Sequence, residues 1–166
     1  GVEKILVVED NLDFQGYLHS ILSEDYDVSV ASNGLEALDI LKQNNFDLVI
    51  SDVMMPDMNG LEFVSNLREK EAFKHLPVIF LSAKNHDLDV ETGLSTGADI
   101  YLTKPIQSKL LLSQIAAVLR REKILKLGNI NEANSTENEF VKQIREIVYR
   151  QLANPALNIT VLADAL

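Results

Sequence analysis

The chain has 166 residues, 46% of them hydrophobic and 24% charged, and 25 acidic against 15 basic residues give a formal net charge of −10. This composition is typical of a soluble globular protein, and the absence of cysteine excludes disulfides, Cys-ligated metal sites and thiol catalysis. Residues 1–119 alone carry 19 acidic and 8 basic residues, an excess of negative charge that disfavours non-specific binding of nucleic acid.

Five short apolar runs are predicted to be β-strands, each followed by a longer segment whose apolar residues have helical spacing. The runs are residues 5–8, 28–30, 48–50, 78–81 and 100–102. Three of them are continuously apolar, as expected of strands covered on both faces. This alternation over about 120 residues predicts a parallel sheet with helices on both sides.

Asparagine stands before each of the first three helical stripes, at the position that a side-chain N-cap prefers. The three candidate caps are Asn11, Asn33 and Asn59. A fourth, less apolar helix is expected over about residues 87–95. The fifth helix is expected to begin after Pro105 and to extend as far as Leu127.

The remaining residues divide into a connection and a second helical segment. Residues 128–138 are polar and rich in Asn, which predicts a linker or exposed loop. Residues 140–152 regain helical spacing before Asn154 and Pro155 end the pattern, and Thr160 is placed to cap a further helix.

The carboxyl ends of the predicted strands carry most of the reactive side chains, and in an open parallel sheet this is where ligands bind. The segments that follow strands one, three, four and five are Glu9-Asp10, Asp52, Ser82-Ala83-Lys84 and Thr103-Lys104-Pro105. The second strand ends in Ala31-Ser32 without an ionisable group, which suits an edge strand and the order 2-1-3-4-5.

Three carboxylates that pack together repel one another unless a cation lies between them. Mg²⁺ suits Glu9, Asp10 and Asp52 because it binds one or two carboxylates and completes its shell with water and phosphate oxygen. Lys104 adds a flexible positive charge, and Ser82 adds a hydroxyl donor. These groups predict a phosphoryl-transfer site in which Asp52 is the nucleophile and forms an acyl phosphate.

Four segments, VVEDN, ISDVMMPDMNG, LSAK and GADIYLTKP, resemble the signature segments of response-regulator receiver domains. The resemblance covers roughly residues 3–119 and implies a flavodoxin-like (βα)5 fold with a five-stranded parallel sheet. A histidine kinase, on the same or a separate chain, is the implied phosphoryl donor to Asp52.

The resemblance also implies individual roles. Asp10 and Asp52 would bind Mg²⁺ directly, Glu9 through water, and the main-chain carbonyl of Met54 would be a third contact. Lys104 would contact the phosphoryl group and precede a cis bond to Pro105. Ser82 would move to the phosphate, and Tyr101 would then turn inward. Glu9 departs from the more usual Asp.

Residues 139–166 resemble the opening of an AraC-type DNA-binding domain, and the alternative is a generic amphipathic helix. The resemblance implies a receiver at 1–127, a linker at 128–138 and a DNA-binding domain whose recognition helix lies beyond this fragment, so the fragment itself should not read DNA. The implied parent is a hybrid histidine kinase or a separate regulator. We expect a cytoplasmic fragment, with any membrane anchor in an amino-terminal sensor, and dimerisation through the fourth-helix, fifth-strand and fifth-helix face or an extended fifth helix.

Other classes of protein fit the residues less well. A haloacid-dehalogenase-type phosphatase needs a second Asp where Met54 stands, and a flavodoxin-like electron carrier would have its phosphate repelled by Glu9 and Asp10. The alternative that stays open is a pseudo-receiver, an interaction or dimerisation module that never takes phosphate. Catalysis by this fragment would be limited to phosphorylation and dephosphorylation of its own Asp52. Met54 and Lys84 would make the dephosphorylation slow.

Overall fold

The computed structural model describes residues 1–83 and 95–134, with side chains described as far as Gly128. The chain divides into two compact units, residues 1–121 and 122–166. Lys84, most of the expected fourth helix and the whole AraC-like segment at 139–166 lie outside the described residues. The described residues include no helix long and apolar enough to cross a membrane.

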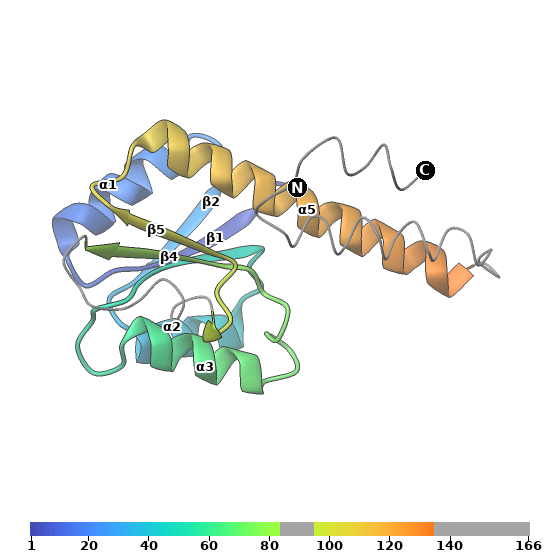
Figure 1. Cartoon of the computed structure of the whole chain (residues 1–166), viewed down its shortest axis with the longest axis horizontal. Helices are drawn as coiled ribbons and strands as arrows, with labels where there is room; N and C mark the ends of the chain where they lie inside the picture. Colours follow the sequence, from blue (N-terminus) through green and yellow to red (C-terminus); the bar gives the residue numbers. More distant parts are fainter. Residues whose placement is uncertain (84–94, 135–166) are drawn as a thin grey trace. The chain divides into compact units, whose positions relative to one another are not determined.

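Strands and helices alternate along the first unit, as the sequence predicts. The elements are β1 (Lys4–Val8), α1 (Leu12–Leu22), β2 (Asp27–Ala31), α2 (Gly34–Gln43), β3 (Leu48–Asp52), α3 (Gly60–Glu69), β4 (Val78–Ala83), β5 (Ile100–Lys104) and α5 (Ser108–Asn134) (Figure 1). All four strand pairings are parallel, and the order is β2-β1-β3-β4-β5. The predicted fold class and strand order are therefore confirmed.

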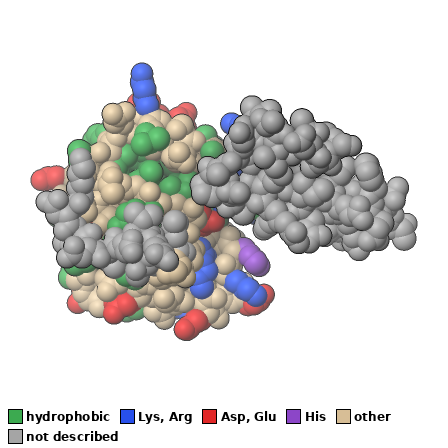
Figure 2. Space-filling model, viewed as in Figure 1, with side chains coloured by type: hydrophobic (Ala, Val, Ile, Leu, Met, Phe, Trp, Pro, Cys, Tyr) green, Lys and Arg blue, Asp and Glu red, His purple; other side chains and the backbone are tan. Residues whose placement is uncertain are grey.

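The face of the first unit seen in Figure 2 carries hydrophobic as well as charged side chains. Acidic side chains occur at several separate places around the outline of the face in Figure 2. On this face, the negative charge of the chain is therefore dispersed. Two acidic residues, Glu9 and Asp52, are instead buried.

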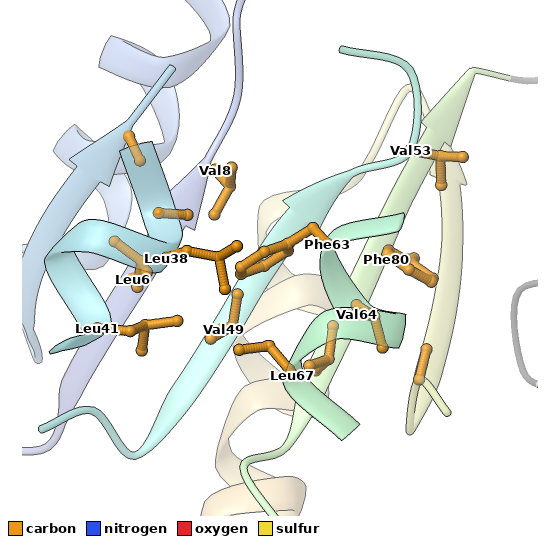
Figure 3. Packing of buried hydrophobic residues seen from close by; sticks show 14 residues of the cluster. Leu6, Val8, Leu38, Leu41, Val49, Val53, Phe63, Val64, Leu67 and Phe80 are labelled. Carbon is orange, nitrogen blue, oxygen red and sulfur yellow. The ribbon is translucent and has the colours of Figure 1, made fainter. Parts of the chain in front are cut away.

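Two hydrophobic clusters cover the two faces of the sheet, because successive side chains of a strand point to opposite faces. Within β1, Leu6 and Val8 belong to the cluster under α2 and α3, which Figure 3 shows. Ile5 and Val7 belong to the cluster under α1 and α5. With both faces covered, the central strands are almost completely buried, which explains their continuous apolar runs.

The three candidate N-caps are confirmed. The side chains of Asn11, Asn33 and Asn59 accept hydrogen bonds from the backbone N–H groups that begin α1, α2 and α3. Asn59 and Glu62 form a complete capping box. Each cap satisfies a donor that the first helical turn leaves unpaired.

The end of α5 differs from the prediction. The helix continues through Gly128 to Asn134, so the first part of the expected linker at 128–138 is helical. A glycine inside a helix costs only about 1 kcal/mol relative to alanine, and residues 128–134 contain no proline that would break the helix. A single glycine and a polar composition were therefore insufficient evidence for a helix end.

A network of charged groups joins α3, β4, β5 and α5 at the amino ends of β4 and β5. Arg68 donates to the carbonyl oxygens of Phe73 (3.1 Å), Leu76 (2.8 Å) and Gly97 (2.7 and 3.0 Å). The carboxylate of Asp99 lies 3.7 Å from Arg68 and accepts from Arg121 at 2.7 Å and from the backbone of Val78 at 2.9 Å. This network anchors the loops that precede β4 and β5.

Candidate functional site

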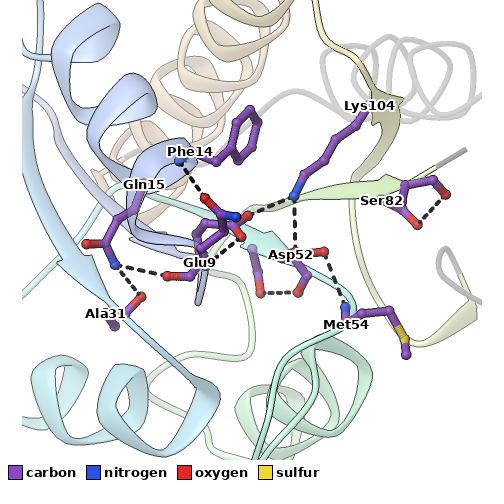
Figure 4. Close-up of polar contacts among 11 residues, drawn as sticks. Glu9, Phe14, Gln15, Ala31, Asp52, Met54, Ser82 and Lys104 are labelled. Carbon is purple, nitrogen blue, oxygen red and sulfur yellow. Dashed lines mark hydrogen bonds and ion pairs between the residues drawn. The ribbon is translucent and has the colours of Figure 1, made fainter.

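The carboxyl ends of β1, β3 and β5 bring three of the predicted site residues into direct contact. The ammonium of Lys104 lies 2.9 Å from Oε2 of Glu9 and 3.1 Å from Oδ2 of Asp52 (Figure 4). These residues are far apart in the chain, but parallel strands end at the same edge of the sheet. The long side chain of Lys104 reaches past β4 to the carboxylates at the ends of β1 and β3.

The third acid, Asp10, completes a cluster. One carboxylate oxygen each of Glu9, Asp10 and Asp52 lies within 4.8 Å of the others. Glu9 and Asp52 are 1% and 8% exposed, whereas Asp10 is open to solvent. Three carboxylates and one ammonium leave an excess of negative charge when all are ionised. The oxygen donor set and this charge fit a hard divalent cation such as Mg²⁺.

Burial and charge shift the ionisation of the two groups that touch. Burial raises the pKa of Glu9, and the nearby charge of Asp52 raises it further, while the hydrogen bond from Lys104 opposes both. Burial by itself would lower the pKa of Lys104, but its contacts with Glu9 and Asp52 outweigh burial, and the pKa is raised. Lys104 is therefore held in its charged form between the two carboxylates.

Glu9 is held at more than one atom. Its Oε1 accepts from the backbone N–H of Asn11 at 3.1 Å. The side-chain amide of Gln15 donates to the carbonyl of Glu9 at 2.9 Å and to that of Ala31 at 3.3 Å. The bond from Asn11 holds the carboxylate, and the bonds from Gln15 hold the backbone at the ends of β1 and β2. Sequence reasoning treated Asn11 as a cap only and did not find Gln15, because nothing in the sequence shows which backbone atoms a side chain reaches.

Asp52 is positioned by the turn that follows β3. Its Oδ1 accepts from the backbone N–H of Met54 at 3.2 Å, and Gly60 donates its N–H to the carbonyl of Val53 at 2.8 Å. A Cβ at Gly60 would lie 2.2 Å from the carbonyl oxygen of Asp52. Only glycine therefore lets α3 begin this close to the end of β3. The proposed metal contact of the Met54 carbonyl stays a prediction.

The two predicted switch residues lie on β4 and β5. Ser82 is buried and its hydroxyl donates to the carbonyl of Ala83 at 3.4 Å. The ring of Tyr101 is half-buried and packs edge-on against Phe80, with 6.4 Å between ring centroids. The movements expected of these side chains stay predictions. The peptide bond between Lys104 and Pro105 is cis.

One contact of Lys104 was not anticipated from the sequence. The centroid of the Phe14 ring lies 4.3 Å from the ammonium. In the sequence Phe14 counts only as one apolar residue of a helical stripe, and no local signal distinguishes it from the others.

Comparisons with known proteins identify the family of the first unit. The response regulator receiver domain family matches residues 5–116. The probable transcriptional regulator ycf29 of Pyropia yezoensis is 35% identical over 143 residues, 86% of this chain and 64% of that protein. Histidine kinase P4 of Formosa agariphila is 31% identical over 171 residues, 98% of this chain and 12% of that protein. The chain thus spans less than two thirds of the length of either relative.

A solved structure has the same fold. The chemotaxis response regulator CheY4 of Vibrio cholerae aligns with a TM-score of 0.67 and 32% identity, over 71% of this chain and 99% of that one. The aligned share is close to the share of the chain in the first unit.

Proposed function

Because the chain belongs to the response regulator receiver domain family, we propose that it is a phosphoacceptor that takes a phosphoryl group onto Asp52. The observation that carries the proposal is the contact of Lys104 with both Glu9 and Asp52, beside the exposed carboxylate of Asp10. This arrangement places a nucleophilic carboxylate, a cation for phosphoryl oxygens and a set of acidic metal ligands at one point.

In the proposed reaction, an oxygen of Asp52 forms a bond to the phosphorus of a phosphohistidine on a histidine kinase. The phosphorus–nitrogen bond breaks, and the imidazole nitrogen keeps its electron pair. Lys104 moves from the carboxylate of Asp52 to an oxygen of the phosphoryl group, whose charge it neutralises. Glu9, Asp10, Asp52 and the Met54 carbonyl would hold Mg²⁺, which when bound supplies further charge neutralisation at the phosphoryl oxygens.

The output is a shift between two conformations. Phosphorylation adds a charge of about −1.5 to −2, taking the phosphate-ester value as a guide. Ser82 then turns to the phosphoryl group and Tyr101 turns inward, and the surface of β5 and α5 repacks. A second copy of the chain binding to this surface or to the extended α5 would transmit the signal to a DNA-binding domain that begins at residues 139–166.

The relatives support this setting. The name of the Pyropia protein is that of a transcriptional regulator, and the similarity to histidine kinase P4 extends over 98% of this chain. The second match runs well beyond the receiver and favours a parent in which kinase and receiver share one polypeptide.

Labelling with radioactive acetyl phosphate in the presence of Mg²⁺ tests the phosphoacceptor. The wild-type chain should acquire a hydroxylamine-labile label, and Asp52→Asn should lose it entirely. Asp57→Asn is the matched control, because Asp57 lies on the same turn with a positive φ of 64° that Asn tolerates well.

Undiminished labelling of Asp52→Asn would refute the assignment of the phosphoacceptor. If the wild-type chain takes no label and does not respond to beryllofluoride with Mg²⁺, the chain is instead a pseudo-receiver that acts through protein contacts alone.

A further inference from the structure

Within the part of the chain that the structure describes, the ammonium of Lys104 has three charged or aromatic neighbours, and one of them is not a carboxylate. The Phe14 ring centroid lies 4.3 Å away, within the distance of about 6 Å at which an aromatic face attracts a cation. The side chain of Lys104 is only 22% exposed, so the attraction acts in a partly desolvated place, where it is stronger than at an open surface.

Asn11 connects Phe14 to Glu9 through two hydrogen bonds. The side chain of Asn11 accepts from the backbone N–H of Phe14 at 2.9 Å, and the backbone N–H of Asn11 donates to Oε1 of Glu9 at 3.1 Å. The N-cap of α1 therefore fixes two of the neighbours of Lys104, the carboxylate of Glu9 and the ring of Phe14. Phe14 also packs against the hydrophobic cluster of α1 and α5, which restricts the ring further.

The Phe14 ring attracts the ammonium of Lys104 in a different way from the two carboxylates. Glu9 and Asp52 hold the ammonium through oxygens that a divalent cation would also bind. A ring face attracts the ammonium without an oxygen atom, so it competes neither for the metal nor for the phosphoryl group. It limits the directions in which a flexible four-carbon side chain can move.

We propose that Phe14 is a positioning residue for Lys104: its ring keeps the ammonium on the Asp52 side of the site, ready for a phosphoryl oxygen. The inference deepens the proposed function and rests on it for the step that follows. Phe14 itself does not touch the reacting atoms.

The contact can be tested without metal or phosphoryl donor. In wild-type protein the aromatic ring should shift the ε-methylene proton resonances of Lys104 upfield of those of exposed lysines in an NMR spectrum. The resonance is assigned by its disappearance in Lys104→Gln. It should return to the ordinary lysine position in Phe14→Leu and stay shifted in Tyr17→Leu, which removes the neighbouring, 43% exposed ring that stacks on Phe14. An unshifted resonance in wild-type protein would overturn the inference, whether or not the Phe14 and Tyr17 variants fold.

The consequence is tested by the rate of labelling with acetyl phosphate and Mg²⁺, a small donor that needs no docking surface. Phe14→Leu should slow labelling by about 3- to 30-fold, the range that a partly buried cation–π contact supports. Phe14→Tyr, which retains the ring, should label at the wild-type rate, and so should Tyr17→Leu. Far-ultraviolet circular dichroism confirms that the variants are folded.

The outcomes distinguish a failure of the role proposed for Phe14 from a failure of the proposed phosphoacceptor function. Wild-type labelling that disappears in Asp52→Asn but is unchanged in Phe14→Leu overturns the role of Phe14 and leaves the phosphoacceptor intact. Equal slowing in Phe14→Leu and Tyr17→Leu also overturns it, because the effect then belongs to the surface of α1. If the wild-type chain takes no label, the proposed function fails, while the NMR shift still decides the contact.

Discussion

Two clusters of charged side chains lie at opposite ends of the same parallel sheet, and they are built in different ways. At the amino ends of β4 and β5, Arg68 and Arg121 form ion pairs with Asp99. Arg68 also donates hydrogen bonds to three backbone carbonyls. At the carboxyl ends of β1, β3 and β5, Lys104 contacts two carboxylates, Glu9 and Asp52, of a cluster of three.

The difference separates a structural cluster from a functional one. Backbone carbonyls are fixed acceptors, so a guanidinium bonded to them holds loops in place and has nothing to exchange. Carboxylates in excess of their cations are costly when buried, and a metal ion or a phosphoryl group can take part in their contacts. Burial of charge occurs at both ends of the sheet. The amino-end cluster has two guanidinium groups for one carboxylate, whereas the carboxyl-end cluster has three carboxylates for one ammonium, and this excess of carboxylates marks the site.

The largest effect on stability is expected from Arg68→Gln, which removes the side-chain donor of three part-buried backbone carbonyls and one of the two arginines beside Asp99. The free energy of unfolding should fall by about 2–4 kcal/mol, equally with and without Mg²⁺, in urea unfolding followed by circular dichroism. Lys104→Gln should also destabilise the metal-free protein, but Mg²⁺ should restore much of the loss because it replaces the missing positive charge. If Mg²⁺ rescues both variants or neither, the two clusters do not differ as proposed.

A smaller effect is expected from Glu9→Gln in metal-free buffer. Since the pKa of Glu9 is raised above its ordinary value of 4.5, the folded protein keeps a proton that the unfolded chain has released. Stability is therefore lost as the pH rises from 4.5 through the folded-state pKa. In Glu9→Gln, stability should depend less on pH in this range. Above this range, the variant should be more stable than wild type by on the order of 1 kcal/mol.

Thermal unfolding in steps of pH checks this expectation. Glu24→Gln, which removes an exposed acid, is the control and should keep the wild-type profile. A Glu9→Gln profile that coincides with wild type would show that Glu9 carries its charge at no cost to the fold.

The smallest effect is expected from Arg121→Gln, which removes the 2.7 Å bond to Asp99. Arg121 is more than a third exposed, so the loss should be only about 0.5–1 kcal/mol. Its neighbour Arg120 is exposed, and Arg120→Gln should change stability by less than about 0.5 kcal/mol. Equal values for the two variants would remove Arg121 from the structural cluster.

Much of the fold could be predicted from local patterns. Continuous apolar runs gave the strands, Asn11, Asn33 and Asn59 marked three helix starts, and the uncharged end of the second strand indicated an edge strand. The end of α5 could not be predicted in this way. Gly128 lowers helix propensity by an amount that neighbouring turns can offset, so composition alone did not decide where the helix stops.

The candidate site, like the fold, could be predicted from the sequence only in part. Glu9, Asp10, Asp52 and Lys104 could be found because each follows a predicted strand, and parallel strands bring their carboxyl ends to one edge. That topology depends only on the order and type of the elements, which the alternation of apolar and polar residues determines by itself.

The tertiary structure alone decided which groups touch. Whether Lys104 bonds to Glu9 as well as Asp52, whether Phe14 covers its ammonium, and whether Gln15 holds the Glu9 carbonyl depend on distances of a few ångströms between residues on separate elements. Such distances come from the twist of the sheet and the packing of α1 against it, and side-chain periodicity carries no information about either. The residue types were therefore readable from the chain, and their contacts were set only by its packing.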